Sequence, residues 1–300
     1  MVSKQAQQQA LHTERRRSQL NLGRISSQLG IYLILVILAV IFGLPFFWTV
    51  LTSLKTTQEI FLMPPTWLPE VPQWQNYVEI WQRAPLAIFL LNSIVVTVFT
   101  MIGQLLSASL VAYGFARFRF PGRDILFVVM LGTLMLPPQV TIIPTFMLFK
   151  ALGMLDTLQP LIIPAYFGGG AFAIFLFRQF FLTIPKEFDE AAKIDGANTF
   201  WIYCYVMLPL STPVLITMAV FSFLQSWNDY FYPLIFLNTT ENFTLAIGLT
   251  YFQRVLSAGG PPKEHLMMAA AIVMTIPSLL VFLFLQKYYT QGIAMSGIKG

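Results

Sequence analysis

Two acids and a lysine stand close together in the stretch EAAKIDGANTF, which begins at Glu190. Carboxylates and amines can exchange protons, so the first chemistry to consider for Glu190, Lys193 and Asp195 is general acid and base catalysis. The same stretch holds one glycine and three alanines, which supply no reactive group but allow close contact. It is therefore either a reactive site or a contact surface, and the rest of the chain must decide between them.

The sequence lacks the partners that most catalytic sites need. It contains no G-x-x-x-x-G-K-[ST] phosphate-binding loop, one cysteine, Cys204, and two histidines, His12 and His265, that are far apart. This spacing disfavours a serine hydrolase, and no cluster of His, Cys, Asp and Glu has the spacing of metal ligands. We therefore expect no catalytic residue, no metal site and no cofactor bound by this chain, and we expect that it is not an enzyme.

The composition is that of a membrane protein. Hydrophobic residues make up 56% of the chain, charged residues make up 10%, and the mean hydropathy is +0.69. A soluble domain carries about a quarter charged residues. A helix needs roughly 20 apolar residues to cross the hydrocarbon core of a bilayer, and six charge-free runs are long enough to contain one. We predict an all-α integral membrane protein with six transmembrane helices. They are expected near Ile31–Ser53, Leu86–Phe115, Ile125–Phe149, Leu158–Phe180, Leu208–Phe231 and Met267–Tyr288.

The distribution of Lys and Arg predicts the orientation in the membrane. With the N-terminus on the cytoplasmic side, thirteen of the 18 basic residues fall inside and five outside. The loop RFRFPGRD after the second span contributes three of the inner arginines. Because short cytoplasmic loops carry an excess of Lys and Arg, both termini and the loop at Glu190 are expected to be cytoplasmic. This bias also accounts for the net charge of +5, so a nucleic-acid partner is not expected.

The chain divides by composition into a tail and a membrane domain. Residues 1–29 are rich in Gln and Ser and include the run Arg15–Arg17, so we expect a disordered, basic cytoplasmic tail that touches anionic lipid. Residues 30–300 contain all six predicted spans and form the predicted transmembrane domain.

The stretch at Glu190 has the pattern of two short helices joined by a tight turn. Thr183 can cap a helix whose first turn includes Pro185. Gly196 suits the left-handed conformation that ends a helix. A second helix is expected to start near Asn198 or Thr199 and to reach Pro209.

One face of the first of these helices is small. Phe188, Ala191, Ala192 and Asp195 are spaced at i, i+3, i+4 and i+7, which brings them to one side. Interfacial helices usually present large apolar groups and a basic polar face. A small face with mixed charge instead favours docking to another protein, with the acids setting register.

Several segments resemble a known family. EAAKIDGA followed by Leu208-Pro209 is similar to the cytoplasmic "EAA" loop of permease subunits of binding-protein-dependent ABC importers. AYGFARFRFPGRD, LPPQVTIIPTFMLFKALGMLDT and SWNDYFYPLIFL resemble segments of the carbohydrate branch, specifically its second, six-span permease, the counterpart of the maltose-system partner. The resemblance covers nearly the whole chain beyond the tail.

The resemblance implies a type I ABC-importer permease fold with a cytoplasmic coupling-helix loop. The implied role is half of a translocation pathway for a carbohydrate in a bacterial or archaeal inner membrane. The implied partners are a second homologous permease, which makes a heterodimer, two copies of a cytoplasmic ABC ATPase that binds ATP and Mg²⁺, and an extracytoplasmic sugar-binding protein. The residues implied to contact the ATPase are Glu190, Ala191, Ala192, Asp195, Gly196, Ala197 and Pro209.

Residues that contact the solute are harder to identify. Trp227, Asn228, Asp229 and Tyr230 combine aromatic faces with hydrogen-bonding groups that suit a polyhydroxylated ring. The same four residues also suit an interfacial aromatic belt with polar contacts between helices. A hinge or unwound helix is suggested by Pro137, Pro138 and Pro144 in the third span and by Gly168, Gly169 and Gly170 in the fourth. Close helix packing accounts for the glycines equally well.

Alternatives to a sugar importer remain open from the sequence. The solute could be a polyol phosphate or another non-sugar compound, since the sequence does not name it. An ion-coupled carrier that works alone is a further alternative, for which Asp229 is the clearest candidate coupling residue. A membrane scaffold that transports nothing is the third.

Overall fold

The computed structural model describes the backbone of residues 2–258 and 263–297. All regular secondary structure in those residues is helical. The chain forms two units, residues 1–73 and 74–300, which are considered separately.

The first unit consists mainly of one long helix. Helix α1 spans Val2–Ser53, and the short α2 spans Thr57–Ile60. Residues 2–29, expected to be disordered, are therefore part of α1, and the predicted boundary at residue 29 does not coincide with a helix end. The local reason is composition, since this segment is rich in Gln, Leu and Arg, contains no proline and has no glycine before Gly23.

The second unit contains all other elements. They are α3 (Asn76–Arg83), α4 (Leu86–Arg117), α5 (Arg123–Gly132), η1 (Thr133–Met135), α6 (Pro138–Ala151), α7 (Gln159–Ile162), η2 (Ile163–Tyr166), α8 (Ala171–Thr183), α9 (Glu187–Ile194), α10 (Thr199–Ile202), the π-helical turn η3 (Tyr203–Met207), α11 (Leu208–Leu210), α12 (Thr212–Trp227), α13 (Phe231–Phe236), η4 (Thr240–Asn242), α14 (Leu245–Ser257) and α15 (Glu264–Gly297).

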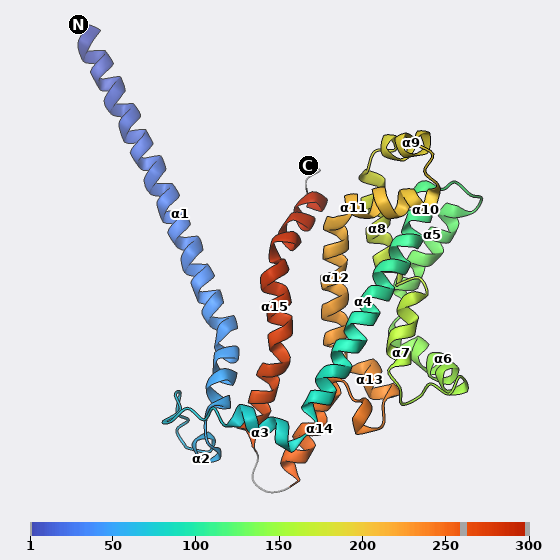
Figure 1. Ribbon diagram of the computed structural model, residues 1–300. Helices are drawn as coiled ribbons and strands as arrows, with labels where there is room; N and C mark the ends of the chain where they lie inside the picture. The colour runs from blue at the N-terminus through green and yellow to red at the C-terminus, as the bar shows by residue number, and fades with distance from the viewer. Residues whose placement is uncertain (1, 259–262, 298–300) are drawn as a thin grey trace. The chain divides into compact units, whose positions relative to one another are not determined.

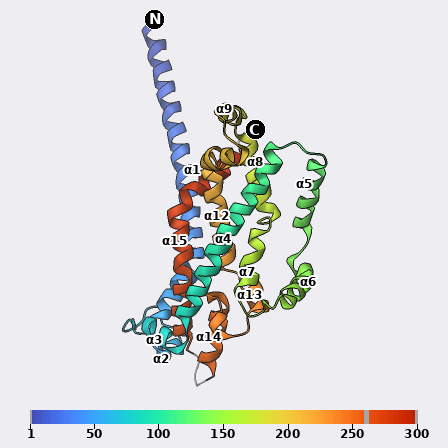
Figure 2. The same ribbon diagram turned by 45° about the vertical axis from the view of Figure 1, so that its right-hand side comes forward.

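Helix α4 runs through the middle of this unit and packs against α8 and α12, while α12 also packs against α15 (Figure 1). In both views the α4–α5 link, α9 and α10 lie at one end, and α3, α13 and α14 lie at the other (Figure 2). Each end has its own apolar core. Phe177, Phe181 and Met207 belong to the core at the α9 end, and Phe89 and Phe252 to the opposite core.

The six predicted spans appear as four apolar helical segments, one of them unwound at Gly168–Gly170, and two bent pairs. Those long and apolar enough to cross a bilayer are residues 28–53, 86–117, 159–183 and 264–284. The pair 123–135 and 139–151 bends by 100°, and the pair 199–210 and 212–227 bends by 80°. Counting each bent pair as one span gives six in the described residues, as predicted.

The third predicted span, Ile125–Phe149, is divided into two helices, which confirms the hinge or unwound helix suggested by its prolines. The chain turns at Pro137 and Pro138, because a residue before proline avoids the α conformation and proline cannot donate a helical hydrogen bond. Pro144 lies inside α6 and does not break it. The fifth predicted helix, Leu208–Phe231, is likewise shorter, since the chain bends at Ser211 and α12 ends at Trp227.

Asp156 fixes the loops at the end opposite α9. Its backbone is left-handed, with φ of 58°, and its N–H donates to the Phe236 carbonyl at 2.8 Å. Its Oδ1 accepts from the N–H groups of Asn238 and Thr239 at 2.8 and 2.9 Å. One acid therefore joins the loop before α7 to the loop after α13.

Candidate functional site

Helices α9 and α10 form a short hairpin at one end of the bundle (Figure 1). Gly196 adopts φ of +85°, and its N–H and that of Ala197 bond to the Lys193 and Ala192 carbonyls at 3.0 and 2.9 Å. Asn198 Oδ1 accepts from the Trp201 N–H at 2.8 Å and so caps α10. The predicted helix, glycine turn and second helix are confirmed, although the second helix includes the π-helical turn η3.

The predicted cap at Thr183 is wrong. Thr183 is the last residue of α8, and its hydroxyl donates to the Phe180 carbonyl at 2.7 Å. Helix α9 starts later, after Lys186, without a side-chain cap. The cause is the α8 helix itself, which continues to the residue that was expected to begin the next element.

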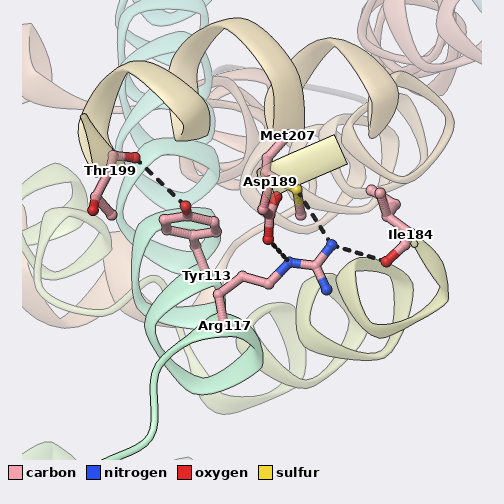
Figure 3. Close-up of polar contacts among 6 residues, drawn as sticks. All are labelled: Tyr113, Arg117, Ile184, Asp189, Thr199 and Met207. Carbon is pink, nitrogen blue, oxygen red and sulfur yellow. Dashed lines mark hydrogen bonds and ion pairs between the residues drawn. The ribbon is translucent and has the colours of Figure 1, made fainter. Parts of the chain in front are cut away.

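A buried ion pair holds α9 against the bundle (Figure 3). Arg117 Nε, at the last residue of α4, lies 2.8 Å from Asp189 Oδ2, and the exposed fractions of the two side chains are 6% and 11%. Arg117 Nη2 also donates to the Ile184 carbonyl at 2.9 Å, just before α9. Because an unpaired buried charge costs several kcal/mol, this pair fixes where α9 can sit.

Two tyrosines hold α10 and η3 against the same stretch of α4. Tyr113 donates to the Thr199 carbonyl at 3.5 Å (Figure 3), and the hydroxyls of Ser109 and Tyr203 lie 2.7 Å apart. The hairpin is therefore fastened along about two turns of α4, from Ser109 to Arg117. A displacement of α9 would be passed to α4 through these contacts.

The predicted contact residues of this loop do not all face outward. Ala192 is buried in the apolar core at the α9 end, so its small side chain lets α9 approach its own bundle. Glu190, Ala191, Asp195 and Gly196 are exposed, Ala197 is half-buried and Pro209 is exposed. Phe188 and Ile194 add apolar surface, with exposed fractions of 49% and 86%. The outer side of α9 thus presents acids, a small residue and two apolar side chains.

A hollow of ≈ 480 Å³ lies in the middle of the bundle. It is enclosed by α4, the broken fourth span, α12, α13 and one residue of α6. Its polar lining residues are Thr100, Gln104, Thr145, Ser222, Gln225, Ser226, Asp229 and Tyr232. The Ser222 hydroxyl is buried and has no hydrogen-bond partner among the described residues. Buried hydroxyls are normally bonded, so this one is available to a bound molecule.

Polar side chains of α4 hold the fourth span in its broken form. Thr100 donates to the Leu161 carbonyl at 3.2 Å, Gln104 to the Gly169 carbonyl at 2.8 Å, and Ser107 to the Ala165 carbonyl at 2.7 Å. These bonds satisfy carbonyls that have lost their helical partners.

Both interpretations of the three glycines apply at Gly169. All three have positive φ, so the helix is unwound there. A Cβ on Gly169 would also lie 2.7 Å from the Gln104 carbonyl oxygen of α4, so the packing is close as well.

Only one of the four residues proposed to contact a solute lines this hollow. Asp229 does, and its Oδ1 accepts from the N–H groups of Phe231 and Tyr232. Trp227 is buried on the other side of α12, where Nε1 donates to the Met274 carbonyl at 3.1 Å. Asn228 bonds back to the Leu224 carbonyl, and Tyr230 is exposed outside the hollow.

Sequence reasoning missed two parts of this site. The pairing of Arg117 with Asp189 has no signal in the sequence, because no local pattern joins residues 72 positions apart. Gln104 and Gln225 were also missed. Each is an amide within an apolar span, and this is the signal that could have identified them. A polar side chain is costly in a membrane unless it has a hydrogen-bonding partner or a function.

Comparisons with known proteins agree with this architecture. Residues 104–295 match the family model "Binding-protein-dependent transport system inner membrane component". The chain is 36% identical to the sn-glycerol-3-phosphate transport system permease protein UgpE of Yersinia enterocolitica, over 89% of this chain and 93% of that protein. It is 32% identical to the arabinooligosaccharides transport system permease protein AraQ of Bacillus subtilis, over 92% and 99%.

A solved structure of a bacterial ABC transporter involved in the import of the acidic polysaccharide alginate has a similar chain. Its TM-score is 0.76 at 26% identity, covering 86% of this chain and 94% of that one. The bundle with its broken spans is thus the type I ABC-importer permease fold, as predicted. The chain belongs to the binding-protein-dependent transport system inner membrane component family and is a permease of an ABC importer.

Proposed function

We propose that this permease forms half of the pathway for an uncharged carbohydrate and that α9 couples the pathway to a cytoplasmic ATPase. The observation that carries the choice of solute is the lining of the central hollow. It offers four hydroxyls of Ser and Thr, two glutamine amides and one carboxylate, groups that bond well to sugar hydroxyls.

The relatives differ in the solutes that their names state. AraQ is named for arabinooligosaccharides and UgpE for sn-glycerol-3-phosphate. A glycerol phosphate or another polyol phosphate is therefore the second candidate, favoured by the 36% identity to UgpE.

The charge of the hollow favours the neutral solute. Among the described residues that line it, Asp229 alone is charged, and no Lys, Arg or His is present. A phosphate dianion beside this carboxylate would be repelled, and repulsion between like charges is stronger where water is scarce. A sugar hydroxyl can instead donate to Asp229 Oδ2, since the two backbone hydrogen bonds use Oδ1.

The partners follow from the same proposal. A second homologous permease completes the pathway, an extracytoplasmic sugar-binding protein delivers the solute, and two copies of a cytoplasmic ATPase bind ATP and Mg²⁺. This chain itself binds no nucleotide and catalyses nothing. Three arginines, from the last residue of α4 to the first residue of α5, support a cytoplasmic location for the α9 end in a bacterial or archaeal inner membrane. Cytoplasmic termini are part of the same proposal.

Coupling would act through α9. The exposed Glu190, Ala191, Asp195 and Gly196 would contact the ATPase, and Ala192 and Asp189 would anchor α9 to its own bundle. ATP-driven closure must favour one state of the permease, which requires contacts whose energy differs between states. The bonds between the hairpin and α4 provide a path from that contact to the helix that lines the hollow.

The test is reconstitution of the complex that copurifies with this chain. We expect a second permease and an ATPase, and we expect ATPase activity to rise with a neutral oligosaccharide on its binding protein but not with glycerol phosphate. Stimulation by glycerol phosphate alone would replace the neutral solute with the second candidate. Uptake by the lone chain under an ion gradient would instead establish an ion-coupled carrier.

The contribution of Asp229 can be tested separately. Asp229→Asn keeps the size of the side chain and removes its charge, so we expect a weaker discrimination against phosphorylated solutes. Asn228→Asp is the matched control, because Asn228 lies outside the hollow. Equal discrimination by both variants would remove Asp229 from the pathway.

A further inference from the structure

A second hollow, of ≈ 630 Å³, lies at the α9 end and is separate from the central one. Three segments line it: the α4–α5 link with Arg119 and Phe120, the first turn of α5 with Arg123 and Asp124, and the α8–α9 link with Lys186. Figure 2 shows the α4–α5 link and α9 at the same end of the bundle.

The charges around it do not balance. Arg123 is paired with Asp124, with Nη2 2.9 Å from Oδ1. Within residues 28–258 and 263–284, Arg119 and Lys186 have no acidic partner. The hollow therefore has two unpaired positive charges. Gly122 begins α5 without a side-chain cap, so the positive end of that helix dipole adds to them.

A further arginine lies behind the first turn of α5. Arg178 of α8 stacks on Phe127, with the guanidinium carbon 4.1 Å from the ring centroid, and Phe127 follows Arg123 by one turn. The Arg178 Nε is buried without a hydrogen-bond partner among the described residues. The excess of Lys and Arg in cytoplasmic loops would explain basic residues at the α9 end. It would not explain why these residues line a hollow.

The rim of the hollow is apolar. Ile125 and Leu182 line it with exposed fractions of 72% and 45%, and Leu126 beside them is 54% exposed. All three belong to α5 or α8, helices that form part of the bent third span and of the fourth span. Large apolar side chains at this depth are normal beside acyl chains and unfavourable in water.

We propose that this hollow binds the phosphate headgroup of an anionic phospholipid, with Arg119 and Lys186 contacting the phosphate and Ile125 and Leu182 contacting the acyl chains. Basic pockets on the cytoplasmic side of membrane helices bind such headgroups. The ligand would bridge the α4–α5 link and the α8–α9 link. The ion pair of Arg117 and Asp189 joins the same two parts of the chain. Arg117 is two residues before Arg119, and Asp189 is three residues after Lys186. A bound lipid would therefore stabilise the position of α9.

The proposal rests on the placement of the bundle in a membrane and not on the solute.

The test places the protein and any copurified subunits in nanodiscs of phosphatidylcholine that contain one fifth phosphatidylglycerol. Retained phosphatidylglycerol is then measured by mass spectrometry after washing. The test variant is Arg119→Gln with Lys186→Gln, and the control is Lys150→Gln with Arg254→Gln, two exposed basic residues outside the hollow.

We expect the test variant to retain less phosphatidylglycerol than the control, by about five-fold for each charge removed. Equal retention by the two variants would overturn the proposal. Competition by inorganic phosphate at millimolar concentration would identify a soluble anion as the ligand and would also overturn the lipid assignment. Loss of a copurified ATPase from the test variant, equally with and without phosphatidylglycerol, would show that these charges contact a protein.

Discussion

Arg117 Nε and Asp189 Oδ2 lie 2.8 Å apart and join the end of α4 to the first turn of α9. Both side chains are almost fully buried, and Asp189 Oδ1 has no hydrogen-bond partner among the described residues. The charges are therefore balanced, but the carboxylate is not fully bonded. Such a pair is costly to break and constrains the position of the element that carries it.

Removal of either partner should destabilise the protein strongly. Asp189→Ala or Arg117→Ala leaves one buried charge, and we expect a loss of about 3 to 5 kcal/mol in the free energy of unfolding. The double variant should lose much less than the sum, because no unpaired charge remains. Thermal unfolding in detergent measures this, with the exposed Glu190→Ala as control. Additive losses would show that the two residues do not interact.

Gly196→Ala should weaken the turn between α9 and α10. Its φ of +85° costs an L-residue about 1 to 2 kcal/mol. Gly114→Ala is the control, since Gly114 is helical and a Cβ there would meet nothing within 4 Å. We expect Gly196→Ala to lower solute-stimulated ATPase activity with normal membrane insertion.

Gly196→Pro and Glu190→Arg should lower uptake and ATPase coupling in the same way. Normal coupling in all three would remove the hairpin from the mechanism.

Gln104→Leu should impair transport more than folding. The substitution keeps the approximate volume but removes the bond to the Gly169 carbonyl and an amide from the hollow. Loss of one hydrogen bond between this amide and the solute, worth about 1 kcal/mol, should lower uptake by about five-fold or more. Gln179→Leu on α8, an exposed residue outside the hollow, is the control. Unchanged uptake by Gln104→Leu would show that this side chain does not contribute to the pathway.

Asp156 should make stability sensitive to acid. Burial acts to raise the pKa of its carboxyl, but hydrogen bonds from Thr239, Asn238 and Asn242 outweigh burial and hold that pKa below its usual value. A depressed pKa contributes stability that is present above the ordinary value of about 3.9 and is lost as pH falls through the folded value. Thermal unfolding of the native protein should therefore weaken below pH of about 4.

The matched variant is Asp156→Asn, which tolerates the same left-handed backbone but cannot ionise. The thermal stability of this variant should not show the loss below pH of about 4 that is expected of the native protein. Asp195→Asn, at an exposed site, should keep the acid dependence of the native protein. If Asp156→Asn loses stability below pH 4 as the native protein does, another carboxylate is responsible.

The apolar runs predicted the number of membrane segments because span length is a local property of the sequence. The glycine turn at Gly196 was predictable for the same reason, since only a few residues adopt a positive φ easily. The prolines also predicted a hinge or unwound helix near Pro137. The bend at Ser211 was not predicted, because how a membrane helix bends near proline depends on which neighbours satisfy the freed carbonyls.

The long-range contacts of the site were beyond the sequence. Ala191 is exposed and Ala192 is buried because α9 packs against the apolar core at its end of the bundle, whereas periodicity alone placed both on one face. Asp229 and Trp227 are two residues apart at the end of α12, and the packing of α12 against α15 decides which of them reaches the hollow. Local pattern gave the candidates, and the packing of helices selected among them.

The three glycines that break the fourth span limit which walls of the hollow can change their chemistry during evolution. Gly169 has no room for a side chain, since even a Cβ would meet the Gln104 carbonyl oxygen at 2.7 Å. That wall of the hollow is therefore backbone, and its chemistry is the same for any sequence that keeps the break. If the hollow carries the solute as proposed, new solute preferences arise from its other walls, where Gln225 and Asp229 contribute side chains.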